Sequence, residues 1–168
     1  MTPSPSDRLA FREMTVDDLD DMAALLGDPG VMRYYARPKD RTEALAWITQ
    51  NRERYRRDGF GLWVLTRTDT GEFVGDCGLT TQKVGGDVDV EVGYHVRPDL
   101  QGRGYATEAA AACRDHARDT LGITRLIAII DPANVPSQRV AEKIGLAYER
   151  DAVYGGGPVR LYATSLRP

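Results

Sequence analysis

The stretch that decides the fold is HVRPDLQGRGYATEAAAACRDHA, residues 95–117. A strand-like segment ends at Pro98, two near-adjacent glycines follow at Gly102 and Gly104, and an alanine-rich helix begins directly after them. Glycine costs backbone entropy, so the pair indicates either a tight turn with positive φ or the close approach of another group. The first N–H groups of a helix are unpaired and its dipole favours an anion. The stretch therefore predicts a turn that binds phosphate or pyrophosphate, with a plain tight turn as the alternative.

Two common nucleotide-binding motifs do not fit this turn. A P-loop requires Lys-Ser or Lys-Thr at a fixed offset, and neither dipeptide follows the glycines. The dinucleotide fingerprint requires Gly or Ala at the position of Thr107, and it belongs on the first strand of a doubly wound sheet. Here the turn lies past the middle of the chain, so both readings fail.

Composition places the chain among ordinary globular proteins. Its 168 residues suit one domain, for which we predict a flexible tail at 1–7 and a single domain at 8–168. A net charge of −3 argues against a nucleic-acid partner, and no apolar run is long enough for a membrane. Because the opening MTPSPSDR lacks a signal-peptide core, we expect a cytoplasmic protein. Cys113 and His116 form only half of a zinc motif, so we expect no metal.

Periodicity predicts alternating strands and helices. Residues 124–130 are almost wholly apolar, which is typical of a strand covered on both faces. The predicted order mixes hairpins with strand–helix–strand crossovers, so the sheet must be mixed, antiparallel early and partly parallel later. The other predicted strands are 8–14, two in a hairpin over 60–80, 88–96, 146–154 and 159–166, and the predicted helices are 15–28, 41–58, one closed by Gly122 and 134–145.

The segment Gln101-Gly102-Arg103-Gly104-Tyr105-Ala106 resembles the Gln/Arg-x-x-Gly-x-Gly/Ala signature of the GNAT acetyltransferase superfamily. The passages EVGYHV, GYATEA and DPANVPSQRVAEKIG around it resemble the RimJ/RimL-like branch, as do the opening RLAFREMTVDDLDDMAAL and the hairpin GEFVGDCGL. The resemblance implies an α/β (α+β) fold with a mixed sheet of about seven strands. That sheet would splay between strands 4 and 5 and be flanked by about four helices.

The resemblance also implies acetyl-CoA as co-substrate, lying where the fourth and fifth strands separate. Its pantetheine arm would pair with the backbone of Tyr94, His95 and Val96, and one of those N–H groups would stabilise the developing oxyanion. Asn134 would hydrogen-bond the pantetheine amide, with a plain helix N-cap as the alternative. The pyrophosphate would lie on the backbone N–H groups of Gln101, Gly102, Arg103, Gly104, Tyr105, Ala106 and Thr107.

Glu91 is the predicted general base. Strand alternation puts Glu91, Gly93 and His95 on one face of the segment 88–96 and its valines on the other. A partly buried carboxylate has a raised pKa suited to taking a proton, and a water would lie between it and the amine. The alternative for Glu91 is an ion-pair partner at a solvent-facing edge. Gly93 could mark the bulge seen in the family, and without that bulge His95 becomes a second candidate base.

The general acid departs from the commonest family pattern. Many members place a tyrosine seven residues after the asparagine, and this chain has Ala141 there. The RimJ/RimL-like branch has Asn-x-x-Ser instead, which Asn134 and Ser137 match, so Ser137 is predicted to hold the CoA sulfur. An exposed first-turn serine is the alternative.

The resemblance predicts an acetyl-CoA-dependent N-acetyltransferase that acts on a primary amine. The acceptor is either a protein N-terminus or a small amine, and the sequence leaves that choice open. Tyr34, Tyr35, Trp47 and Tyr55 either line the acceptor site or pack in the core. The rival function is a CoA-binding sensor without turnover. The family often pairs through its last strands, so a homodimer is a further expectation.

Overall fold

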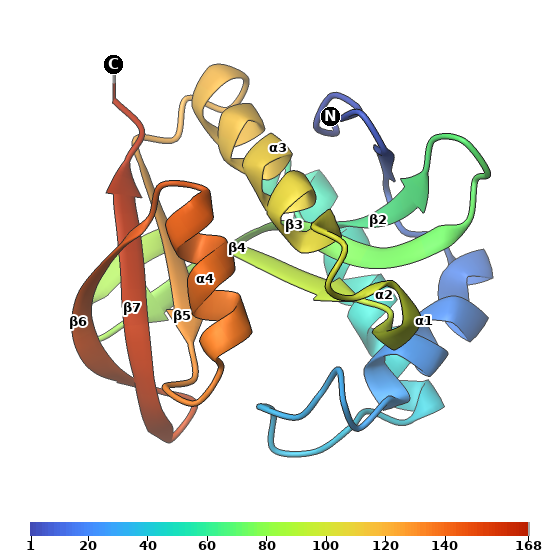
Figure 1. Cartoon of the computed structure of the whole chain (residues 1–168), viewed down its shortest axis with the longest axis horizontal. Coiled ribbons are helices and arrows are strands. Elements are labelled where there is room, and N and C mark those ends of the chain that lie inside the picture. Colours follow the sequence, from blue (N-terminus) through green and yellow to red (C-terminus); the bar gives the residue numbers. More distant parts are fainter. Residues whose placement is uncertain (168) are drawn as a thin grey trace.

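The computed structural model describes residues 1–167, and it shows a twisted sheet with helices on both faces (Figure 1). Seven strands and four α-helices follow one another in the predicted order. Their bounds are β1 Leu9–Arg12, α1 Leu19–Gly27, α2 Arg41–Asp58, β2 Leu62–Arg67, β3 Phe73–Val84, β4 Asp87–Val96, α3 Tyr105–Asp119, β5 Arg125–Ile130, α4 Val135–Lys143, β6 Ala147–Tyr154 and β7 Gly157–Ser165.

The strand order β1-β2-β3-β4-β5-β7-β6 confirms the predicted mixed sheet. Every neighbouring pair is antiparallel except β4 and β5, which are parallel. That parallel ladder contains only Val90 opposite Leu126 and Glu91 opposite Ile127. Beyond these two pairs β4 and β5 diverge, so the backbone of β4 from Val92 onward has no strand beside it on this side.

Two helices cover each face of the sheet (Figure 1). On one face α1 and α2 enclose a core that includes Met22, Ile48 and the β2 residue Val64. On the other face α3 lies across β3 and β4, with α4 beside it. Ala109, Ala110 and Ala117 of α3 are fully buried, because small side chains let a helix approach the sheet closely.

The two cysteines meet under α3. Cys77 of β3 and Cys113 of α3 are free and buried, with their sulfur atoms 3.6 Å apart. Burial raises the pKa of the Cys77 thiol well above its usual value. Both therefore act as small apolar core residues. Within residues 1–167, no cluster of three or more His, Cys, Asp or Glu side chains is arranged to hold a metal ion.

Three local features differ from the sequence-based expectations. The predicted helix over 15–28 begins as a 3₁₀ turn at Val16–Asp18 before α1 starts. The strand β3 continues to Val84 and turns through two glycines directly into β4, where a shorter strand was predicted. The register between β3 and β4 is continuous past Gly93, so the expected bulge is absent from this ladder.

The first seven residues form no helix or strand, yet Pro3 is buried and Ser6 contacts α3. The Ser6 hydroxyl donates to Glu108 Oε1 at 2.7 Å. Among the helices of residues 1–167, none combines the length and the apolar character needed to span a bilayer.

Candidate active site

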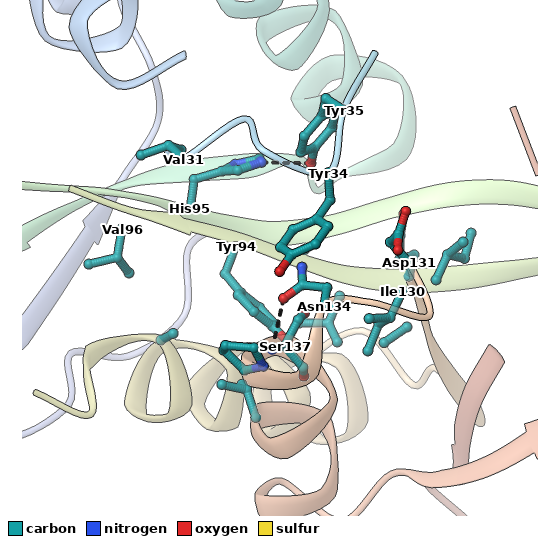
Figure 2. Close-up of a pocket in the computed structure, with 18 of the residues that line it drawn as sticks. Val31, Tyr34, Tyr35, Tyr94, His95, Val96, Ile130, Asp131, Asn134 and Ser137 are labelled. Carbon is teal, nitrogen blue, oxygen red and sulfur yellow. Dashed lines mark hydrogen bonds between the residues drawn. The ribbon is translucent and has the colours of Figure 1, made fainter. Parts of the chain in front are cut away.

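A cleft of about 1340 Å³ lies where β4 and β5 diverge. It is lined from both faces of the sheet: by the 28–40 loop and α2 on one face, and by α3 and α4 on the other. Figure 2 shows the same division, with Tyr35 and His95 on one side of the strands and Asn134 and Ser137 on the other. A ligand in this cleft therefore contacts groups from both faces of the sheet.

The turn before α3 forms one end of the cleft. Gly102 and Gly104 have φ of 74° and 84°, so the positive-φ explanation for these glycines is correct. A side chain at Gly102 would meet no atom within 4 Å, which means that this face of the turn is open. Within residues 1–167, no hydrogen bond occupies the N–H groups of Gly102 through Thr107. The turn thus combines the backbone that glycine allows with unpaired donors for an anion.

One member of the predicted phosphate-binding set, Gln101, needs correction. The Gln101 N–H donates to the Pro98 carbonyl at 3.3 Å, and its side-chain Nε2 donates to the Val96 carbonyl at 2.9 Å. Gln101 therefore braces the turn. Arg103 is absent from the lining of the cleft, and its carbonyl accepts from Arg8 Nη1 at 3.0 Å, while its N–H remains unpaired within residues 1–167. The other predicted residues of this turn do line the cleft.

The backbone N–H groups of β4 point alternately toward β3 and toward the opposite side. The Arg97 N–H donates to the Val74 carbonyl at 2.9 Å, so alternation along the antiparallel ladder turns the N–H groups of His95 toward β3. Those of Tyr94 and Val96 face the side where β5 has separated. Tyr94 and Val96 therefore keep the predicted backbone donors, while His95 can contribute only its side chain.

Asn134 and Ser137 lie at the start of α4, opposite β4. Asn134 Oδ1 accepts from the Ser137 N–H at 3.2 Å, so its N-cap role is confirmed. The Tyr94 hydroxyl lies 2.9 Å from both the carbonyl oxygen and Oγ of Ser137. Sequence reasoning missed this tyrosine side chain, which brings a second hydroxyl to Ser137 at the start of α4. Ala141 itself is fully buried in the core.

Glu91 lies on the opposite face of β4, lining the cleft beside Thr80. Burial raises the pKa of this carboxyl from 4.5 to about 7, while hydrogen bonds from Gln82, the Ile129 backbone and Thr80 lower it less. The Thr80 hydroxyl donates to Glu91 Oε2 at 3.3 Å. No arginine or lysine is paired with Glu91 within residues 1–167, so the ion-pair alternative is wrong. A carboxyl with this environment exchanges protons near neutral pH.

A buried polar chain lies next to Glu91. Asp76 of β3 is fully buried and lies 2.7 Å from His95 Nδ1, and His95 Nε2 lies 2.7 Å from the Tyr35 hydroxyl. Trp47 Nε1 donates to the other Asp76 oxygen at 3.0 Å. Asp76 was missed from the sequence, although an aspartate in the otherwise apolar stretch FVGDCGL was the available signal.

The four aromatic residues that the sequence left open divide between cleft and core. Tyr34, Tyr35 and Trp47 line the cleft. Tyr55 does not: its hydroxyl bonds the Leu62 carbonyl, and its ring stacks parallel to that of Trp63 at 6.4 Å. Tyr55 is therefore a core residue.

Comparison with known proteins identifies the family of this chain. The acetyltransferase (GNAT) domain family matches residues 8–147. An uncharacterized protein of Bacillus subtilis, YkkB, is 36% identical over 94% of this chain and 92% of its own length. The crystal structure of an acetyltransferase from Agrobacterium tumefaciens has a TM-score of 0.85 at 25% identity, covering 98% and 94% of the two chains.

The fold is also similar to that of RimL, described as a ribosomal L7/L12 alpha-N-protein acetyltransferase in complex with coenzyme A. Its TM-score is 0.79 at 17% identity, and 98% of each chain is covered. At that identity the likeness concerns the fold. The family match spans most of the sequence, and the divergence of β4 from β5 supplies the cleft that an acetyltransferase needs. The chain therefore belongs to the GNAT acetyltransferase family and is an acyltransferase.

Proposed function

We propose that this protein transfers an acetyl group from acetyl-CoA directly to a primary amine. One observation carries the proposal: a single cleft brings together the unpaired N–H groups before α3 and the carboxyl of Glu91. The first group suits a pyrophosphate, and the second suits proton removal from an ammonium ion. The cytoplasmic location and the pairing into a homodimer remain predictions.

On one face of the sheet the cleft residues would bind acetyl-CoA, and on the other they would bind and deprotonate the acceptor amine. Gly102, Gly104 and the first turn of α3 would bind the phosphates, and Asn134 would bind the pantetheine arm. An N–H group of Tyr94 or Val96 would donate to the thioester oxygen, where negative charge develops during transfer. On the other face Glu91, ionised above pH about 7, would take a proton from the acceptor ammonium directly or through a water.

The hydroxyl pair of Tyr94 and Ser137 would donate a proton to the leaving CoA sulfur. Because these hydroxyls lie 2.9 Å apart, a proton given up by Ser137 Oγ can be replaced from Tyr94. Burial raises the pKa of Tyr94, so its hydroxyl is protonated at neutral pH. This arrangement would compensate for the tyrosine that Ala141 replaces.

A small amine is the acceptor class that the cleft favours. The Tyr154 hydroxyl at the β6–β7 hairpin donates to Gln82 Oε1 of β3 at 2.6 Å, and Tyr35 of the 28–40 loop reaches His95. The first contact links the β6–β7 hairpin to β3 and the second links the 28–40 loop to β4, so together they enclose the acceptor side of the cleft. A protein N-terminus needs an open groove there, whereas a small amine needs an enclosed pocket with an acid inside.

The test is thiol release from acetyl-CoA in the presence of a panel of amines: amino acids, aliphatic amines, polyamines and short peptides. We expect release with one or more small amines and little with peptides. Isothermal titration with CoA would be run in parallel. CoA binding without release for any amine would overturn the enzymatic proposal in favour of a sensor.

A further inference from the structure

Three alternate residues of β4 form the floor of the acceptor side of the cleft: Glu91, Gly93 and His95. Residues two apart on a strand are separated by about 7 Å, so Glu91 and His95 flank a space that Gly93 leaves open. A Cβ at Gly93 would meet only Leu62 Cδ2, at 3.7 Å. An acceptor nitrogen over Gly93 therefore lies between the Glu91 carboxyl on one side and the His95 imidazole, with its Tyr35 partner, on the other.

The hydrogen bonds around His95 fix where its proton lies. The Asp76 carboxylate accepts hydrogen bonds and donates none, so the 2.7 Å contact places the histidine proton on Nδ1. In the neutral imidazole, His95 Nε2 then has a lone pair, and it accepts from the Tyr35 hydroxyl at 2.7 Å. The hydrogen of Tyr35 thus points at His95, and its oxygen lone pairs are left for a donor in the cleft.

Acetyl transfer to an ammonium ion removes two protons from one nitrogen. The first leaves before attack, and the second leaves after the C–N bond has formed. We propose that Tyr35 is a catalytic residue: its hydroxyl takes the second proton while passing its own to His95 Nε2, and Asp76 stabilises the resulting imidazolium. This relay rests on the proposed function, and it leaves the first proton to Glu91.

The bonds and protons balance. The nitrogen lone pair forms the C–N bond, and the C–S pair leaves with the sulfur, which takes one proton from the Tyr94–Ser137 hydroxyls. Two protons pass from the nitrogen, one to Glu91 and one through Tyr35 to His95. After those hydroxyls regain their proton, the net release is one proton per acetyl group transferred, as the overall reaction requires.

The surroundings of His95 suit a relay. The ionisable groups that face it are Asp76 from β3, Glu91 from β4 and Tyr35 from the 28–40 loop. From α2 His95 contacts the neutral ring of Trp47. Lys39 Nζ lies over that ring, 5.5 Å from its centroid. Although the Tyr35 residue as a whole is half-exposed, desolvation of its hydroxyl raises the pKa of Tyr35, so the hydroxyl is protonated before the relay begins.

The test compares Tyr35→Phe with Glu91→Gln, using an active acceptor whose α-amino group has a pKa of about 8. Turnover would be measured from about pH 6 to 9.5. Raising the pH supplies neutral amine and so makes the first proton acceptor dispensable, but it does not remove the second proton. We expect the defect of Glu91→Gln to fade above about pH 8 and that of Tyr35→Phe to persist at about 100-fold.

The controls separate chemistry from structure. Tyr148→Phe also deletes a hydroxyl from a half-exposed ring, 52% against 48% for Tyr35, but lies outside the cleft and should retain full turnover. Tyr35→Phe should keep the melting temperature and CoA affinity of the wild type. Two outcomes would overturn the relay and leave the proposed function standing. Either the wild type is active and the turnover of Tyr35→Phe lies within twofold of it, or the defect of Tyr35→Phe fades at high pH. A wild type that acetylates no amine would overturn the proposed function with it.

Discussion

Replacing Glu91 by glutamine should stabilise the protein above pH 7 and leave its stability near pH 4 almost unchanged relative to wild type. Burial raises the pKa of Glu91 in the folded protein from 4.5 to about 7. The folded state therefore holds a proton between these values that the unfolded chain has lost. A proton held in this way makes the free energy of unfolding fall by about 1.4 kcal/mol per pH unit.

The size of the effect follows from the two pKa values. Over the interval from 4.5 to about 7 the wild type loses about 3 kcal/mol of stability through this one group. Its contribution is fully present below pH 4.5, is lost as pH rises through about 7, and is constant above that. Glutamine does not titrate, so the variant should gain up to about 3 kcal/mol over the wild type between pH 4 and pH 8.

Urea unfolding followed by tryptophan fluorescence at several pH values measures this difference, and subtracting the two proteins cancels every other titrating group. Glu149→Gln is the matched control, because a hydrogen bond from Arg125 lowers the pKa of Glu149. The Glu149 carboxylate therefore stabilises the wild type at neutral pH, and this stabilisation is lost as the pH falls. The pH dependence of the stability difference between Glu149→Gln and wild type should thus have the opposite sign to that of Glu91→Gln. If the stability difference between Glu91→Gln and wild type stayed within about 0.5 kcal/mol across this range, the buried-base argument would be refuted.

Two further substitutions test the cofactor side of the cleft. Gly104→Glu should abolish CoA binding measured by calorimetry, because a side chain and a negative charge enter the phosphate site, while the circular dichroism stays native. Gly122→Glu is the control, since it carries the same positive-φ strain outside the cleft. Equal CoA affinity in both variants would contradict the assignment of the phosphate site. Tyr94→Phe and Ser137→Ala should each lower kcat about 10- to 100-fold with a nearly constant KM for acetyl-CoA. The double variant should be no slower than the slower single variant, because the two hydroxyls act as one unit. Losses of activation free energy that add in the double variant would show that the two hydroxyls act separately.

The local rules of the sequence were enough for the order of elements and for the turn before α3. Gly102 and Gly104 indicate positive φ, and the apolar run at 124–130 indicates a strand covered on both faces. The mixed order of strands and helices restricts the sheet to a few topologies. Alternation also placed Glu91 and His95 on one face of β4. These features depend on neighbours along the chain, which is why the sequence alone determined them.

What the tertiary structure decided concerns groups far apart in the chain. The meeting of Asp76 with His95, of Tyr35 with His95, and of Tyr94 with Ser137 depends on which elements the fold packs together, and no local pattern specifies it. The direction of the His95 amide depended on the β3–β4 register, and the loss of Gln101 as a free donor depended on a turn closed by Pro98. Burial, and with it the raised pKa of Glu91, exists only once the sheet and its helices enclose the carboxyl, because desolvation is a property of all surrounding atoms together.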